Sequence, residues 1–148
     1  MEHLWLWLAL PGAVIWLGVL AAPWLPWLNR ERLEAEPEAA EDLSGVTVLV
    51  PARDEADVIQ ATLAGLDAQG QGLRVIVIDD QSTDATARIA AAAGARVING
   101  DDKPVGWAGK LWALEQGLRE VRTPLVLLVD ADIELKPGMI AALLRRKQ

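Results

Sequence analysis

The sequence predicts an α/β protein with a mostly parallel sheet and helices on both faces, preceded by one apolar N-terminal helix. From residue 46 onward, short apolar runs alternate with amphipathic stretches of helical spacing. The strand-like runs are apolar on successive residues, which is typical of strands covered by helices on both sides. Before residue 29, a long uncharged segment stands apart from this alternation.

That segment is an uncharged run of 25 residues, from Leu4 to Leu28. A helix of that length is about 37 Å long, against a hydrocarbon core of about 30 Å, and Pro23 and Pro26 shorten it. Tryptophans lie near both ends of the run, as they do at membrane interfaces. A cleaved signal peptide is the rival interpretation, but "MEH" is not basic and the run is long; a buried core helix ranks lower. We therefore expect residues 1–29 to form a transmembrane anchor.

Charges on either side of the run set the expected orientation. Glu2 precedes it, whereas Arg30 and Arg32 follow it, so the positive-inside bias places the rest of the chain in the cytoplasm. The predicted localisation is therefore the membrane, crossed once, with the soluble part cytoplasmic. Residues 30–45 are acidic, include Pro37 and lack a sustained apolar face. They are expected to be a juxtamembrane linker or, equally, the solvated face of a short helix.

Eight elements are predicted in the remaining region, 46–148. In chain order they are a strand at 46–50, a helix at 54–69, a strand at 73–79, a helix at 83–94, a strand at 95–99, a helix at 109–121, a strand at 124–130 and a helix at 137–147. Gly94 supplies a C-terminal stop for its helix, and Pro137 suits the first turn of the last helix. One face of the first helix carries Val58, Ile59, Leu63 and Leu66.

Polar clusters follow three of the predicted strands. "PARDE" follows the first strand, "DDQSTD" the second and "DAD" the fourth. The carboxyl ends of parallel strands meet at one edge of a sheet, and ligands bind beyond that edge. If these residues only capped helices, similar residues would be expected at the opposite edge as well. The three clusters are therefore expected to form one site.

The first two clusters each have a purely structural interpretation. "DDQSTD" can be an N-cap in which Ser82 or Thr83 opens the next helix, but this leaves Asp79 and Asp80 together unexplained. For "PARDE", the structural interpretation is a surface turn whose acidic residues favour the start of the next helix, and it is as good as the functional interpretation. Under the functional interpretation, Asp80 accepts N–H or O–H hydrogen bonds from the base or ribose of a nucleotide.

The acid pair in "DAD" indicates a metal. Asp130 and Asp132 follow an apolar run, so both lose water if the strand end is covered, and each raises the cost of ionising the other. Mg²⁺ or Mn²⁺ would neutralise them and fill its remaining positions with water and phosphate oxygens. In "KPVGWAGKLWAL", Lys110 and backbone N–H groups at a helix start suit a phosphate. Taken alone, that segment is better interpreted as a glycine-rich loop with a solvated lysine.

Composition and motif placement argue against several other classes. Cysteine is absent and the single histidine is His3, which excludes disulfides and thiolate metal sites and nearly excludes histidine-based catalysis. A net charge of −7 argues against nucleic acid held by a basic face. A dinucleotide-binding oxidoreductase would need G-x-G-x-x-G where this chain has "PARDEA". An aspartyl phosphatase or a receiver-type phosphoacceptor would place its acids after the first strand.

Four segments together resemble a known family. "VTVLVPARDEADVI", "VIVIDDQSTDATA", "GWAGKLWALEQG" and "LLVDADI", in this order, resemble the nucleotide-binding half of family 2 glycosyltransferases, which have the GT-A fold with a Rossmann-like sheet. The resemblance covers roughly residues 46–144. "GWAGKLWAL" with "DDQSTD" is most similar to the hopene-associated membrane glycosyltransferases, near carotenoid-type enzymes. This implies a GT-A nucleotide-sugar-binding domain at 46–148, truncated at its C-terminus.

The resemblance also implies roles for matching residues. Asp80 matches the acid that reads uracil, and Lys110 lies in the loop facing the diphosphate. The loop that lines the base and ribose is matched by Pro51, Arg53 and Glu55. Asp130 and Asp132 match the metal-binding DxD pair, with Asp132 as the direct ligand and Asp130 also as the ribose partner. Many members have Tyr-Asn where this chain has Arg53-Asp54, so a guanidinium plane would stack on the base and the nucleotide preference stays open.

The implied activity is a metal-dependent, inverting transfer of a sugar from a nucleoside-diphosphate donor, expected to be a UDP-sugar. The acceptor would be a lipid or another membrane-associated molecule, and nucleic acid is not expected as a partner. In the family, the general base lies further along the chain, so it is expected beyond Gln148. The alternative is a non-catalytic, membrane-tethered fragment that binds a nucleotide-sugar but lacks this base.

Overall fold

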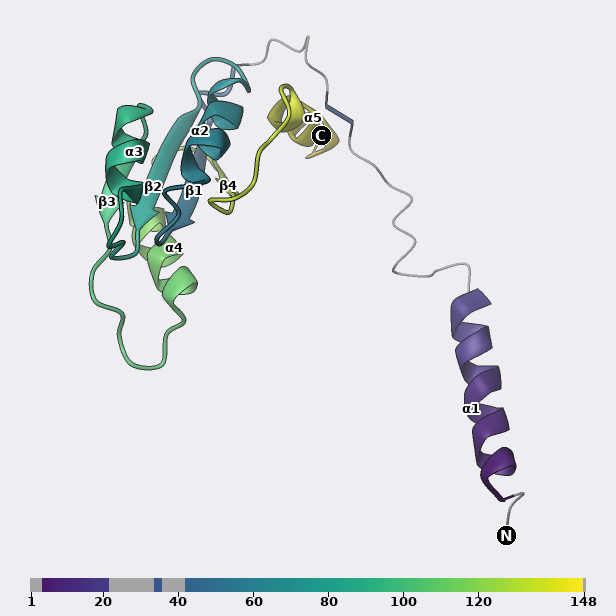
Figure 1. Cartoon of the computed structure of the whole chain (residues 1–148). Coiled ribbons are helices and arrows are strands. Elements are labelled where there is room, and N and C mark those ends of the chain that lie inside the picture. Colours follow the sequence, from purple (N-terminus) through teal and green to yellow (C-terminus); the bar gives the residue numbers. More distant parts are fainter. Residues whose placement is uncertain (1–3, 22–33, 36–41, 148) are drawn as a thin grey trace. The chain divides into compact units, whose positions relative to one another are not determined.

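The computed structural model describes residues 4–21, 34–35 and 42–147 (Figure 1). The chain divides into two units, residues 1–32 and 33–148, and each is described by itself. The first unit contains helix α1 (Leu4–Ala21), which includes Pro11. Most of the predicted 30–45 linker lies outside the described residues, as do the arginines and the tryptophans after α1 that supported the anchor.

Helix α1 corrects the prediction of a membrane anchor. Among the helices of the described residues, none combines the length and the apolar character needed to cross a bilayer. The predicted transmembrane helix, and with it the single-pass membrane localisation, is therefore wrong.

The second unit contains a four-stranded sheet in which every pairing is parallel, in the order β3-β2-β1-β4. The strands are β1 (Val46–Ala52), β2 (Arg74–Asp79), β3 (Arg96–Asn99) and β4 (Leu125–Leu128). The helices are α2 (Ile59–Asp67), α3 (Thr86–Ala92), α4 (Gly109–Arg119) and α5 (Met139–Lys147). The predicted α/β class with a parallel sheet is confirmed.

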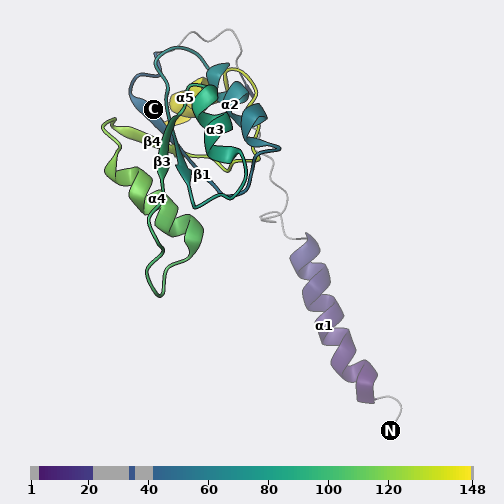
Figure 2. The same ribbon diagram turned by 60° about the vertical axis from the view of Figure 1, so that its left-hand side comes forward.

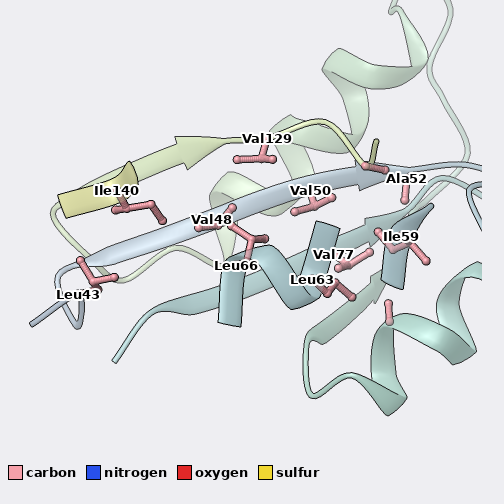
Figure 3. Close-up of a cluster of buried hydrophobic side chains, with 12 residues drawn as sticks. Leu43, Val48, Val50, Ala52, Ile59, Leu63, Leu66, Val77, Val129 and Ile140 are labelled. Atoms are coloured by element: carbon pink, nitrogen blue, oxygen red, sulfur yellow. The ribbon is translucent and has the colours of Figure 1, made fainter. Parts of the chain in front are cut away.

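Helices cover both faces of this sheet, with α4 on one side and α2, α3 and α5 on the other (Figure 2). Val48 and Val50 of β1 point to the first core, where they pack with Ile59 of α2 (Figure 3). Leu49, between them, points to the opposite face and packs with Ala113 of α4. The alternation of side chains along β1 therefore fills two cores, which explains why successive residues of this strand are apolar.

The strand order places a crevice beside β1. From β1 the chain proceeds to β2 and β3 on one side, and after α4 it returns to pair β4 on the other side of β1. The order thus reverses between β1 and β4, which is where parallel sheets bind ligands beyond the carboxyl ends of their strands. The β1–α2 loop, the start of α4 and the segment after β4 meet at this edge.

Helix α2 and strand β4 differ from the prediction in ways that the structure explains. The predicted helix start at residue 54 is wrong, because Asp54 has φ 53°, a left-handed conformation that does not belong to a helix; residues 56–58 form a turn, and α2 begins at Ile59. Strand β4 is less buried than predicted: Leu125 and Leu127 are half-buried, and Val126 and Leu128, on the face beside α4, are 39% and 56% exposed. Burial on both faces thus holds for β1 but not for β4.

Candidate functional site

A pocket of about 470 Å³ lies at the carboxyl ends of β1 and β4. Its lining comes from four segments of the chain: the end of β1 with the loop after it, the residue after β2, the first turns of α4, and the segment after β4. All seven predicted site residues line it: Pro51, Arg53, Glu55, Asp80, Lys110, Asp130 and Asp132. The structure therefore brings together residues that are up to 81 positions apart in the sequence, while their individual roles stay predictions.

The opposite edge of the sheet differs in chemistry. A hollow of about 390 Å³ there is lined by the ends of α2 and α3 and the starts of β2 and β3. Asp67 is its single charged lining residue, and the rest are apolar residues, glycines and one glutamine. This hollow therefore lacks the facing acidic and basic residues that line the pocket at the carboxyl edge.

Two ion pairs cross the pocket. Lys110 Nζ lies 2.5 Å from Asp130 Oδ1, and both side chains are about half exposed. Arg53 Nη1 lies 3.7 Å from Asp80 Oδ2, which is an ion pair without a close hydrogen bond. The lining contains four carboxylates and two cationic side chains, so its formal charge is −2. This residual charge favours a divalent cation in the pocket.

The first residue of α4, Gly109, lies close to the pocket because it has no side chain. A Cβ atom on Gly109 would lie 3.1 Å from Asp80 Oδ2, closer than most real contacts of a Cβ atom. The absence of a side chain at this position lets the first turn of α4 lie against the carboxylate. Lys110, the next residue, then reaches Asp130 on the far side of the pocket.

Asp79 and Asp80 are adjacent in sequence but have different environments. Asp80 lines the pocket, and its side chain is 14% exposed. Asp79 is buried, is not among the lining residues, and its Oδ1 has no hydrogen-bond partner among the described residues. Of the two acids, Asp80 is therefore the one placed to contact a ligand.

Ser82 and Thr83 do not cap α3, contrary to the structural interpretation of "DDQSTD". The residue before α3 is Ala85, and no side chain makes a capping hydrogen bond from it. Ser82 Oγ instead accepts a hydrogen bond from Asp54 N–H, and Thr83 donates to the Asp54 carboxylate. These side chains join the loops after β1 and β2, a contact that no local sequence pattern indicates.

Asp84 belongs to the same pair of loops. The Thr86 hydroxyl and then the Thr86 backbone N–H donate to its carboxylate, and the Ala56 N–H donates as well. These hydrogen bonds stabilise the ionised form and hold the pKa of Asp84 below its ordinary value of 3.8. Asp84 is therefore an anionic acceptor at neutral pH, serving the two loops rather than the pocket.

Small lining residues were not predicted as part of the site. Ala52, Ala113 and Ala131 line the pocket together with Gly109. Ala131 separates the two acids of the DxD pair, and Ala113 lies one helical turn after Gly109 on α4. Their small side chains leave the pocket open; Ala52, Ala131 and Gly109 adjoin predicted site residues in the sequence, whereas Ala113 does not.

The donor atoms of Asp130 and Asp132 suit Mg²⁺ or Mn²⁺, which prefer oxygen ligands. Within the described part of the chain, no group of three or more His, Cys, Asp or Glu residues is placed to hold a metal ion. Two carboxylates alone form an incomplete shell for such an ion. The residues therefore fit a metal that takes its other ligands from water and from the phosphates of a bound nucleotide.

The sequence model of the family described as "Glycosyl transferase family 2" matches residues 47–148, more than half of the chain. This chain belongs to glycosyl transferase family 2. The family predicted from the four motifs is confirmed, and the pocket lies inside the matched region.

Curated relatives of this family 2 member carry the name 4,4'-diaponeurosporenoate glycosyltransferase. The protein from Staphylococcus haemolyticus (strain JCSC1435) is 35% identical over 97 residues, which cover 64% of this chain and 26% of that protein. The protein from Staphylococcus aureus (strain USA300) is 36% identical over 105 residues, covering 70% and 28%. This chain therefore spans about a quarter of the length of these relatives.

Solved structures give the same fold. Glucosyl-3-phosphoglycerate synthase from Mycobacterium tuberculosis, in complex with Mn²⁺, UDP and glucosyl-3-phosphoglycerate, is 30% identical with a TM-score of 0.55, covering 62% of this chain and 35% of that chain. Mannosyl-3-phosphoglycerate synthase from Rubrobacter xylanophilus is 30% identical with a TM-score of 0.56, covering 67% and 35%.

Proposed function

We propose that this chain is the donor-binding part of a family 2 glycosyltransferase and holds a nucleotide-sugar, a UDP-sugar, together with Mg²⁺ or Mn²⁺. The observation that carries the proposal is the pocket of charge −2 at the reversal of strand order, which gathers every residue of the predicted set. The complex of the mycobacterial glucosyl-3-phosphoglycerate synthase with UDP and Mn²⁺ supports the choice of ligands.

Each side of the pocket has a proposed task. Asp80 accepts the ring N–H of uracil, and Arg53 stacks on the base beside it, with Pro51 and Glu55 completing the base and ribose side. On the other side, Lys110 pairs with the diphosphate. Asp132 and Asp130 are proposed to hold the metal, and Asp130 also contacts the ribose. When bound, the metal neutralises the charge of the departing diphosphate.

The acceptor and the stereochemistry are finer parts of the proposal. We propose an inverting transfer to a lipid acceptor, supported by the diaponeurosporenoate named in the curated relatives. We further propose a lipid acceptor of the hopene type, which the resemblance of "GWAGKLWAL" with "DDQSTD" to the hopene-associated enzymes implies. Inversion needs a base that takes the proton of the acceptor hydroxyl, and we place this base beyond Gln148.

Calorimetric titration of UDP with Mn²⁺ and with a chelator tests the proposed site. We expect tighter binding with Mn²⁺, because the pocket of charge −2 repels a bare diphosphate. Asp132→Asn should remove most of the difference between the two conditions. Asp57→Asn, which changes an exposed acid that does not line the pocket, is the matched control and should retain it. Equal UDP affinity with Mn²⁺ and with chelator would rule out the proposed metal site.

A measurement of turnover distinguishes sugar transfer from the alternative in which the chain only binds a nucleotide-sugar. Formation of a glucosylated lipid together with UDP from UDP-glucose and a lipid acceptor, by this chain alone, would establish transfer. Metal-dependent UDP binding without such product formation would favour the nucleotide-sugar-binding module. Both outcomes are measured on the same preparation, so a loss of folding would be seen as a loss of UDP binding.

A further inference from the structure

Two loops beside the pocket are joined by side chains from both. Three successive backbone N–H groups of the β1–α2 loop donate across the gap: Asp54 to Ser82 Oγ (3.0 Å), Glu55 to Thr86 Oγ1 (2.8 Å) and Ala56 to Asp84 Oδ2 (3.1 Å). In return, Asp54 Oδ1 accepts hydrogen bonds from Thr83 N–H (2.7 Å) and Thr83 Oγ–H (3.1 Å). We call these five hydrogen bonds the loop clasp.

Asp54 takes part in the loop clasp as both donor and acceptor. Its φ of 53° lies in the left-handed region. Residues other than glycine adopt this region infrequently, although Asn and Asp do so more readily than most. A residue stays in such a conformation where its surroundings hold it there. Its two neighbours in sequence, Arg53 and Glu55, both line the pocket. The conformation at Asp54 therefore sets the directions in which these two side chains leave the loop.

We propose that Asp54 is a positioning residue that sets the nucleobase specificity of the pocket, acting through Arg53 and Asp80. This inference rests on the proposed function, because it requires a base beside Asp80. The Arg53–Asp80 pair is 3.7 Å apart and the Arg53 side chain is 63% exposed, so the pair is too weak to fix the loop by itself. The loop clasp supplies the missing restraint.

A purely structural role for the loop clasp would show itself differently. The helices after the two loops are anchored independently of it, because Ile59 of α2 and Ala90 of α3 are fully buried in the core. Asp54 and Thr83, in contrast, are exposed. Loss of their hydrogen bonds should therefore disturb the direction of Arg53 more than it disturbs the fold. The measurable consequence is a change in the preference between bases rather than a uniform loss of binding.

The test is calorimetric titration of UDP and CDP, both with Mn²⁺, against wild type and three variants. Asp54→Asn tolerates the left-handed φ and retains an oxygen for Thr83 N–H, so its ratio of UDP to CDP affinity should stay within about twofold of wild type. Asp54→Gly retains the backbone freedom but loses the acceptor, and its ratio should fall about threefold to tenfold. Ser82→Ala removes the reciprocal acceptor and should lower the ratio in the same direction.

Two further measurements make the result decisive. The affinity for Mn²⁺ alone should not change in any variant, because Asp130 and Asp132 lie on a different segment. Urea unfolding should show that Asp54→Gly remains folded; if it does not, Ser82→Ala carries the test.

The outcomes separate this inference from the function on which it rests. If wild type prefers UDP and neither Asp54→Gly nor Ser82→Ala changes that preference, the positioning role is wrong and the proposed function stands. Equal losses of UDP and CDP affinity in Asp54→Gly indicate a structural role and also overturn the inference. If wild type with Mn²⁺ binds neither nucleotide, the proposed function fails, and the inference fails with it.

Discussion

Alanine at Gly117 should destabilise the protein, because helix α4 packs tightly against the sheet at this glycine. An added Cβ atom would lie 2.7 Å from Ile78 Cδ1, 3.0 Å from Ile78 Cγ1 and 3.3 Å from Leu49 Cδ1. Ile78 and Leu49 are both fully buried, so neither side chain can move into solvent to relieve the contact. The Gly117→Ala variant must therefore push α4 outward or force Ile78 from its preferred rotamer.

The expected cost follows from two opposing terms. Overpacking a buried contact costs about 1–3 kcal/mol, whereas alanine in place of glycine inside a helix gains about 1 kcal/mol. Gly117→Ala should therefore lower the free energy of unfolding by about 1 kcal/mol, with a range of about 0–2 kcal/mol. Ile78→Val removes Cδ1, the nearest atom, and alone costs about 0.5–1.5 kcal/mol. In the Ile78→Val background, most of the cost of Gly117→Ala should disappear.

Urea unfolding followed by circular dichroism measures all four proteins of this double-mutant cycle. We expect a coupling of about 0.5–2 kcal/mol between the two positions. Two results would refute the reasoning. One is stabilisation of wild type by Gly117→Ala of about 1 kcal/mol, which helix propensity alone predicts. The other is additivity of the two substitutions within about 0.5 kcal/mol, which would mean that the two residues are not in contact.

Three predictions concern the site and the loops beside it. Lys110→Met removes the cation paired with Asp130, worth about 0.2–1 kcal/mol for an exposed pair, so calorimetry should show Mn²⁺ alone binding about 1.4- to 5-fold tighter. UDP with Mn²⁺ should bind less tightly to the same variant. If the affinities for Mn²⁺ alone and for UDP with Mn²⁺ changed in the same direction, the assignment of Lys110 to the diphosphate would be contradicted. Wild type should bind UDP about tenfold to a hundredfold more tightly than CDP. Asp80→Ala should narrow this preference while the Mn²⁺ dependence of binding remains. A wild type that prefers GDP would contradict the uridine assignment. The folded-state pKa of Asp84 is depressed, so its stabilising effect is present above 3.8 and is lost as the pH falls through the lower, folded-state pKa. Asp84→Asn should therefore make unfolding, measured in urea from pH 7 to pH 3, less sensitive to acid than in wild type.

The sheet and the site edge were predictable because their physical causes are local. In β1 and β2, successive apolar residues such as Leu49 and Val50 face two different cores, and this pattern is visible in the sequence. Parallel strands place their carboxyl ends together, so clusters after strands one, two and four had to converge once the strand assignment was right. Asp80 and Asp130 meet in one pocket for this reason.

The loop clasp was not predictable because its cause is not local. The residue pairs that it joins are 28 to 31 positions apart, and either partner alone has an adequate local explanation. Ser82 and Thr83 have the composition of an N-cap, and only the structure shows that their partner is Asp54. The apolar N-terminal run was misjudged for a different reason: its composition alone was taken to define a spanning helix, whereas none of the helices in the described residues has the length and apolar character to cross a bilayer.

The charge of the pocket explains why the metal and the nucleotide should depend on each other. A nucleoside-diphosphate sugar carries about two negative charges on its diphosphate, so a pocket of charge −2 repels it when no metal is present. A divalent cation is attracted, but Lys110 already neutralises Asp130, and two carboxylates are an incomplete shell for Mg²⁺ or Mn²⁺. If both ligands were bound, their charges would cancel, Lys110 would be free to contact the diphosphate, and Asp130 would be free to hold the metal. Each ligand would therefore remove the obstacle to the other, and the observed contact of Lys110 with Asp130 would give way to the proposed contact with the diphosphate.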